Sequence, residues 1–175
     1  PVIAARLSSA DMTSALGIRE ATLAERTTIV EFNRRLALES EGKALDVATL
    51  EQGVARALVS PEYCRYFVAE ADGQIVGQTM LTYEWSDWRN GLFWWIQSVY
   101  VPVPWRGQGV FRALFEHLRR LAQQTPEVCG LRLYVEEHNQ PALATYERLG
   151  MRPSGHKLYE LEMAGDRGRR LQGFR

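Results

Sequence analysis

A predicted strand that runs directly into a glycine loop and then into an amphipathic helix is the feature that most constrains this chain. It occupies residues 99–118, which read VYVPVPWRGQGVFRALFEHL. The loop, Arg106-Gly107-Gln108-Gly109, lies where the helix begins, so several of its backbone N–H groups are placed to hold a phosphate. The pattern predicts an α/β fold whose ligand is a nucleotide or a nucleotide-containing cofactor.

Two well-known phosphate loops do not fit this stretch. A P-loop needs G-x-x-x-x-G-K-[ST], and no such run occurs in the sequence. The dinucleotide fingerprint G-x-G-x-x-G fits at Gly107 and Gly109, but Arg112 stands at its third glycine. A third pattern, R/Q-x-x-G-x-G/A, matches from Arg106 to Val110 and departs at its last position, where Phe111 replaces Gly or Ala.

A second motif follows in the C-terminal half. A strand predicted over residues 131–135 leads to Asn139-Gln140-Pro141-Ala142, then to Tyr146 and Gly150-Met151. Asn139 suits an N-cap, Pro141 the first helical turn, and Gly150 the position after the helix. In this order and spacing the two motifs resemble the cofactor motifs of the Gcn5-related N-acetyltransferase (GNAT) family. The alternative for Tyr146 is a core aromatic on the apolar stripe of its helix.

Composition excludes several other classes. The 175 residues suffice for one domain with a sizeable core, and 21 basic and 21 acidic residues give zero formal net charge. A dedicated nucleic-acid binder usually has a basic excess, so no nucleic-acid partner is expected. The sequence shows no membrane span, signal peptide or metal-ligand spacing. Cys64 and Cys129 are interpreted as reduced thiols of a cytoplasmic protein.

The periodicity of apolar residues predicts the order β-α-α-β-β-β-α-β-α-β. The expected strands cover residues 17–21, 64–71, 74–83, 92–101, 131–135 and 156–163. The expected helices run from a capping box at Thr22 and Glu25 to about residue 40, and over residues 46–59, 109–124 and 139–149. Residues 1–16 are an N-terminal extension, 17–163 a single acetyltransferase domain, and 164–175 a basic tail.

The resemblance to the family covers residues 17–163 and implies a mixed, mostly antiparallel central sheet flanked by helices. It also implies that strands four and five splay apart to admit acetyl-CoA. Pyrophosphate would rest on the loop and helix start, and pantetheine along strand four, where an N–H near Val99 or Tyr100 would polarise the thioester. The predicted cofactor residues are Val99, Tyr100, Val101, Arg106, Gly107, Gln108, Gly109, Val110, Phe111, Arg112 and Asn139.

Tyr146 matches the family position that protonates the departing thiolate, so it is predicted to be the general acid. The base stays open, because Gln97-Ser98 stand where many family members carry a carboxylate. The candidates are Glu39, Glu41, Glu84, Asp87, Glu137, His138 or a water molecule. Phe93, Trp94 and Trp95 are expected in the sheet core or a subunit interface, whereas Trp85 and Trp88 could line an acceptor pocket.

The predicted reaction is direct transfer of an acetyl group to a primary amine of a small molecule or a protein, without an acyl-enzyme. A homodimer is expected from the family. The alternative is a non-catalytic module that binds or senses acyl-CoA with the same fold. Gln97 favours that alternative, whereas Tyr146 together with Asn139 favours the enzyme.

Overall fold

The computed structural model describes residues 16–161, and these divide into two compact units between Glu136 and Glu137. The predicted extension, apart from residue 16, and the predicted basic tail lie outside the described residues. The first unit holds a five-stranded sheet in the order β1-β2-β3-β4-β5. All neighbouring strands are antiparallel except β4 and β5, which are parallel. This is the predicted mixed, mostly antiparallel sheet.

Apart from the last predicted strand, the elements follow the predicted order along the chain. The strands are β1 (Gly17–Glu20), β2 (Cys64–Ala71), β3 (Gln74–Ser86), β4 (Gly91–Tyr100) and β5 (Val128–Leu133). The helices of the first unit are η1 (Leu23–Glu25), α2 (Arg26–Glu41), α3 (Val47–Ala57), η2 (Val103–Trp105) and α4 (Val110–Gln123). The second unit contains α5 (Gln140–Arg148).

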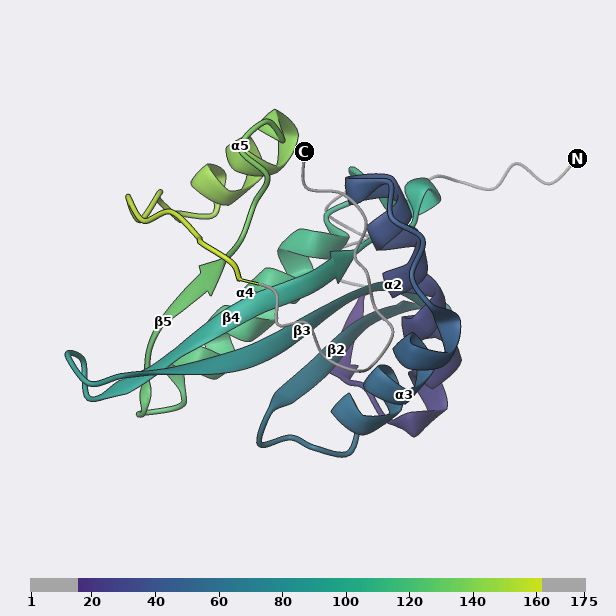
Figure 1. Cartoon of the computed structure of the whole chain (residues 1–175), viewed down its shortest axis with the longest axis horizontal. Coiled ribbons are helices and arrows are strands. Elements are labelled where there is room, and N and C mark those ends of the chain that lie inside the picture. Colours follow the sequence, from purple (N-terminus) through teal and green to yellow (C-terminus); the bar gives the residue numbers. More distant parts are fainter. Residues whose placement is uncertain (1–15, 162–175) are drawn as a thin grey trace, which may run out of the picture. The chain divides into compact units, whose positions relative to one another are not determined.

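Helices cover both faces of the sheet. The contacts of β2 show this, because successive side chains of a strand point to opposite faces. Tyr66 and Val68 join the core cluster formed with α2 and α3. Between them, the Phe67 ring lies 5.6 Å from the His117 ring of α4. Figure 1 shows α4 behind the sheet, and it shows the β3–β4 hairpin extending beyond the other strands. Strand β3 is the central strand, and β4 lies between β3 and β5.

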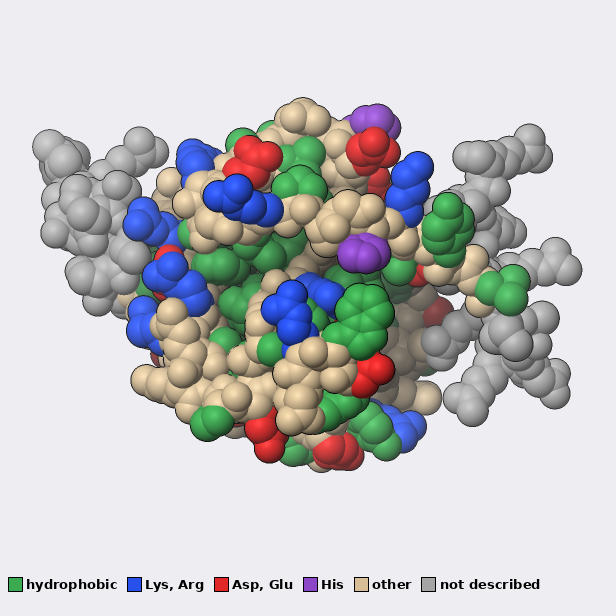
Figure 2. Space-filling model, turned by 90° about the vertical axis from the view of Figure 1, so that its left-hand side faces the viewer, with side chains coloured by type: hydrophobic (Ala, Val, Ile, Leu, Met, Phe, Trp, Pro, Cys, Tyr) green, Lys and Arg blue, Asp and Glu red, His purple; other side chains and the backbone are tan. Residues whose placement is uncertain are grey.

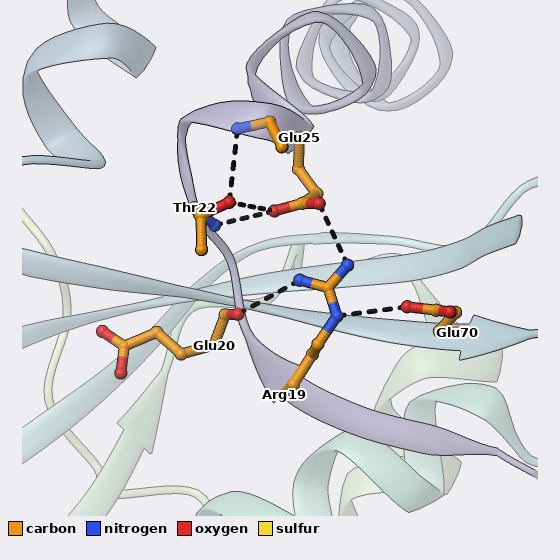
Figure 3. A network of polar contacts seen from close by, with 6 residues as sticks. Arg19, Glu20, Thr22, Glu25 and Glu70 are labelled. Atoms are coloured by element: carbon orange, nitrogen blue, oxygen red, sulfur yellow. Dashed lines mark hydrogen bonds and ion pairs between the residues drawn. The ribbon is translucent and has the colours of Figure 1, made fainter. Parts of the chain in front are cut away.

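Local turn chemistry explains how the elements begin and end. Asp72 and Gly73 both have positive φ, 49° and 75°, as the tight β2–β3 hairpin requires. Thr22 and Glu25 form the predicted capping box, which starts η1 and leads into α2. Figure 3 shows Arg19 of β1 holding Glu25 at 3.0 Å and Glu70 of β2 at 3.1 Å. This polar network fixes the turn from the sheet edge into the first helices.

Three predicted strand boundaries need correction. Strand β3 continues to Ser86, because Trp85 and Ser86 pair with Leu92 and Gly91. Strand β5 starts three residues earlier than predicted and ends at Leu133, where its pairing with β4 ends. The predicted strand at 156–163 is wrong over its described residues, 156–161, which form no strand. Alternating apolar residues there lack a paired neighbour, and a strand needs one.

Candidate functional site

Strands β4 and β5 separate partway along β4, as predicted. Their parallel pairing ends where Ile96 meets Leu133, whereas β4 continues to Tyr100. The edge of β4 from Gln97 onward is therefore not paired with β5. Open strand edges offer N–H and C=O groups to an extended ligand, and pantetheine, with its two amides, has the chemistry to pair with one.

A β-bulge lies in this open part of β4. Gln78 pairs with Tyr100 and Met80 pairs with Gln97, so two residues of β4, Ser98 and Val99, stand opposite Thr79. Ser98 has a φ of 50°, an uncommon value for a residue other than glycine. Nothing in the sequence of this stretch signalled the bulge.

Two carbonyls of the bulge accept hydrogen bonds from side chains of β3. The Gln97 carbonyl accepts from Thr79 Oγ1 and the Ser98 carbonyl from Gln78 Nε2, both at 3.2 Å. A trans peptide is planar, with its N–H opposite to its C=O. The N–H groups of Ser98 and Val99 therefore point away from β3, toward the edge of β4 that β5 leaves open. The prediction of a polarising N–H near Val99 or Tyr100 fits this geometry at Val99.

The glycine loop leads into α4 with the expected geometry. Gly109 is the N-cap of α4 and has a φ of 82°, in the left-handed region that glycine adopts readily. The first backbone hydrogen bond of the helix joins Ala113 N–H to the Gly109 carbonyl. N–H groups of the first turn, such as those of Val110 and Arg112, have no intrahelical acceptor and carry the positive end of the helix dipole. The loop can therefore bind an anion.

Phe111, the departure from the sequence pattern, packs its ring against the ring of Phe115 at 6.2 Å. The Phe111 ring is half-buried along the helix. Its backbone lies in the first turn of α4, at the position where the sequence pattern has Gly or Ala.

Gly77 of β3 sets how closely α4 approaches the sheet. A Cβ atom at Gly77 would lie 2.6 Å from Val110 Cγ1, a distance that side chains do not adopt. Val110 is 1% exposed, so the start of α4 is pressed onto the strand next to β4. The absence of a side chain at Gly77 thereby places the glycine loop close to the bulge-bearing strand.

The side chain of Arg106, a predicted cofactor residue, is bound by two groups of the protein. Its Nε donates to the Val101 carbonyl at 2.8 Å, and its guanidinium forms an ion pair with Glu39 at the end of α2. The Tyr100 hydroxyl also donates to Glu39, at 2.8 Å. Arg106 foremost, and then Tyr100, lower the pKa of Glu39. Sequence reasoning missed this cluster because its members are far apart in the chain.

The other base candidates in the first unit also have partners. Glu84 accepts from Trp95 Nε1 and from Arg132 Nη1, the latter at 2.8 Å. Glu41 pairs with Lys43 at 2.7 Å, and Asp87 accepts from the Trp88 N–H. Gln97 donates to Thr82 Oγ1, so it is engaged beside the bulge. A water molecule stays an alternative for the base.

The aromatic residues differ in burial: of Phe93, Trp94 and Trp95 only Trp94 is fully buried, and the pocket role of Trp85 and Trp88 stays a prediction. Trp94 is 4% exposed and belongs to the core. Phe93 and Trp95 are half-buried: Arg132 lies 3.6 Å over the Phe93 ring, and Trp95 stacks on Tyr134 at 4.3 Å. Gly130 makes room for Phe93, because a Cβ there would lie 2.7 Å from the ring. Trp88, at 93% exposed, lies at the tip of the β3–β4 hairpin.

The second unit contains the other motif. Asn139 is the N-cap of α5, and its side chain accepts from the Ala142 N–H at 3.2 Å. Gly150 follows the helix with a φ of 88°, as predicted. Burial raises the pKa of Tyr146 above its ordinary value of 10.0. Glu137 and His138 are exposed residues of the segment before α5.

Two further kinds of site do not occur among residues 16–161. None of their helices is long and apolar enough to cross a membrane. These same residues contain no group of three or more His, Cys, Asp or Glu side chains that could hold a metal ion. Basic and acidic side chains lie among one another on the face seen in Figure 2, in keeping with the zero net charge.

Known proteins resemble this chain in sequence and structure. The acetyltransferase (GNAT) family model matches residues 30–151. A crystal structure of a possible acetyltransferase from Clostridium difficile 630 is 43% identical, with a TM-score of 0.81, and the match covers 86% of this chain and 99% of that one. No curated protein gives a significant match.

More distant structures share the fold. A predicted acetyltransferase from Clostridium acetobutylicum, solved with acetyl-CoA, is 18% identical with a TM-score of 0.67, over 84% of this chain and 96% of that one. A ribosomal-protein-alanine N-acetyltransferase from Brucella melitensis biovar Abortus 2308 is 16% identical with a TM-score of 0.68, over 85% and 99%.

Proposed function

Because the chain belongs to the GNAT family of acetyltransferases, we propose that it transfers the acetyl group of acetyl-CoA directly to a primary amine. The acceptor is a small molecule or an amine of a protein. The observation that carries the proposal is the junction of two features in the first unit. The open edge of β4 from Gln97 to Tyr100 leads through η2 to the glycine loop at the start of α4.

Each part of acetyl-CoA has a matching feature in this proposal. Pyrophosphate binds at the first-turn N–H groups of α4 and the loop before it, where the helix dipole favours an anion. Pantetheine runs along β4 at Val99, Tyr100 and Val101. The proposed cofactor residues are those two stretches with Asn139, namely Val99, Tyr100, Val101, Arg106, Gly107, Gln108, Gly109, Val110, Phe111, Arg112 and Asn139.

The chemistry is an acyl transfer through a tetrahedral intermediate. The neutral amine attacks the thioester carbon, and the carbonyl oxygen gains negative charge, which the N–H groups of Ser98 and Val99 stabilise. The C–S bond then breaks, and the thiolate takes a proton from the Tyr146 hydroxyl. The amine nitrogen loses its extra proton to the base, and the products are an amide and CoA.

Among the base candidates, Glu39 is better suited to hold Arg106 in place than to take a proton. A carboxylate whose pKa is lowered by a guanidinium is a weaker base. Arg106, the first residue of the loop, is itself held by Glu39 and the Val101 carbonyl. Its guanidinium therefore has a fixed position beside the proposed pyrophosphate site.

Direct titration tests the proposal. Isothermal titration with acetyl-CoA should show saturable binding, whereas NADH and ATP serve as control ligands. Gly109→Val should weaken binding, because valine is strained at a φ of 82° and covers the loop. Thiol release is then screened with a library of amines.

A charge reversal at each end of α4 tests whether its first turn, next to the loop, is part of the proposed site. Arg112→Glu should weaken acetyl-CoA binding about thirtyfold, since it removes one positive charge and adds one negative charge near the phosphates, each worth roughly 1 kcal/mol at an exposed site. Arg120→Glu makes the same change in the last turn of the same helix and should leave affinity unchanged. Equal affinity in both variants and the wild type would remove the loop from the site.

The second candidate is a module that binds acyl-CoA without turnover. Gln97 favours it, because its side chain cannot act as a carboxylate base and already donates to Thr82. Saturable acetyl-CoA binding with no thiol release across the amine library would establish this candidate instead. We also propose a cytoplasmic location, which suits the free thiols Cys64 and Cys129, and a homodimer.

A further inference from the structure

We propose that Gln78 is a positioning residue for acetyl transfer: its side-chain amide holds the Ser98 peptide so that the Val99 N–H faces the thioester oxygen. The inference rests on the proposed function. It adds the side chain that orients the Val99 N–H. Gln78 touches no reacting atom in this scheme and acts through the backbone of β4.

Gln78 lies at the centre of a buried polar chain. It is 0% exposed, and its Nε2 donates both to Asn33 Oδ1 of α2 at 2.7 Å and to the Ser98 carbonyl at 3.2 Å. Asn33 Nδ2 donates in turn to the hydroxyl of Tyr66, at 3.0 Å. The chain connects α2 and β2 to the bulge through one glutamine. Three buried polar side chains, from α2, β2 and β3, are thus linked to one peptide of β4.

The orientation of the Gln78 amide is set by its partners. Both neighbours of Nε2 are oxygens that accept, so the opposite orientation would place three oxygens together. The cost of this arrangement is visible, since Gln78 Oε1 is buried without a hydrogen-bond partner among the described residues. A buried oxygen without a hydrogen bond destabilises the folded protein, so the two donor contacts of Nε2 are made at a cost in stability.

The bulge needs such support because its own conformation is unfavourable. Ser98, at a φ of 50°, occupies a region that is unfavourable for a residue other than glycine. Thr79 provides a second support, because its hydroxyl holds the Gln97 carbonyl. Without Gln78 and Thr79, the Ser98 and Val99 peptides can rotate, and their N–H groups no longer converge on one oxygen.

The experiment uses acetyl-CoA labelled with ¹³C at the thioester carbonyl and needs no acceptor. In the wild type, infrared difference spectra should show the bound carbonyl stretch shifted to lower frequency than in free acetyl-CoA, since an N–H donor polarises it. Gln78→Met keeps the length of the side chain and removes the donor. The shift should be largely lost, and the preference for acetyl-CoA over CoA in titrations should fall about tenfold.

A second variant and a control keep the test decisive if Gln78→Met does not fold. Thr79→Val is nearly isosteric, removes the hydroxyl donor to Gln97, and should reduce the same carbonyl shift. Val54→Ala in α3 changes a site that is 2% exposed and whose core cluster includes Tyr66 but no residue of the bulge. It controls for lost stability and should keep the full shift.

The outcomes separate the two ideas. Wild-type protein that fails to bind acetyl-CoA would overturn the proposed function and this inference with it. Wild-type protein that binds with a shifted carbonyl, alongside Gln78→Met and Thr79→Val with the same shift, would overturn the positioning role alone. Equal loss of the shift in Val54→Ala would show that general destabilisation, not Gln78, is responsible.

Discussion

At the scale of single residues, Tyr146 carries a proton that a departing thiolate can take, although its raised pKa makes it a weaker acid than an ordinary tyrosine. Burial raises its pKa above 10.0, so the hydroxyl keeps its proton throughout the neutral range and is available to a departing thiolate. Tyr146→Phe removes the proton and little else. We expect turnover to fall about a hundredfold while the affinity for acetyl-CoA stays near that of the wild type.

Steady-state thiol release and titration of acetyl-CoA check this prediction. Tyr63→Phe removes a hydroxyl from a tyrosine that is 62% exposed, and it should leave both quantities unchanged. In the wild type, the alkaline fall in activity should lie above about pH 10, since a raised pKa delays the loss of the acidic proton. Unchanged turnover in Tyr146→Phe would remove the acid role from this residue.

Residues that act through local sequence were predictable, and those that act through distant partners were not. Gly109 and Asn139 reveal their roles by their neighbours in the chain, because a left-handed N-cap and a side-chain cap are local devices. The Arg106–Glu39 pair and the Ser98 bulge depend on α2 and β3 packing against β4. Gln78 offered one signal, since its amide and the Thr79 hydroxyl interrupt the apolar residues of β3.

At the scale of elements, Gly77 lets α4 pack on β3. Gly77→Ala would bring a Cβ to 2.6 Å from Val110 Cγ1, and overpacking of this kind costs about 1–3 kcal/mol. Gly77→Ala should therefore lower the free energy of unfolding by that amount and weaken acetyl-CoA binding, because the start of α4 is displaced. Urea unfolding and titration measure the two effects.

A compensating change and an opposite control sharpen the prediction for Gly77. Val110→Ala removes the clashing methyl group, so the double variant should recover part of the lost stability. Gly53→Ala lies within α3 with nothing within 4 Å of the added Cβ, and it should stabilise by about 0.5–1 kcal/mol. Simple additivity of Gly77→Ala and Val110→Ala would show that the two positions do not compete for space.

The capping box makes the start of the first helices sensitive to acid. Arg19 foremost, with Thr22, lowers the pKa of Glu25 from 4.5 to about 2. The stabilisation is fully present above about pH 4.5 and is lost as pH falls toward about 2. Glu25→Gln should reduce the free energy of unfolding by about 1 kcal/mol at neutral pH. In urea titrations the difference should shrink near pH 3, and a constant difference would contradict the role of charge.

The periodicity of apolar residues predicted most of the helices and strands. The ends of β3 and β5 depend instead on how far these strands pair with β4. The Thr22 capping box, the Asp72-Gly73 hairpin and Gly42 after α2 were visible in the sequence and are present in the structure. The extension of β3 to Ser86 depends on β4 opposite it, which no local pattern records. Residues 156–161 show the reverse case, because their alternating pattern forms no strand without a partner.

At the scale of the whole molecule, the proposed cofactor residues lie in both compact units. Binding should therefore protect backbone amides in both from hydrogen exchange, over residues 97–112 of the first unit and 139–146 of the second. Acetyl-CoA at a hundred times its dissociation constant stabilises the bound state by about 2.7 kcal/mol. Exchange that requires release of the ligand should slow by up to about a hundredfold.

Peptides from α3 are the internal reference, because their local opening does not involve the proposed site. Protection over 97–112 alone would exclude Asn139 and Tyr146 from the cofactor site and would leave the departing thiolate without its proposed acid. Protection of α3 to the same degree would indicate that exchange reports global unfolding, and shorter labelling times would then be needed to compare the units. Protection in both stretches but not in α3 would mean that the two motifs, far apart in sequence, meet on one molecule of acetyl-CoA.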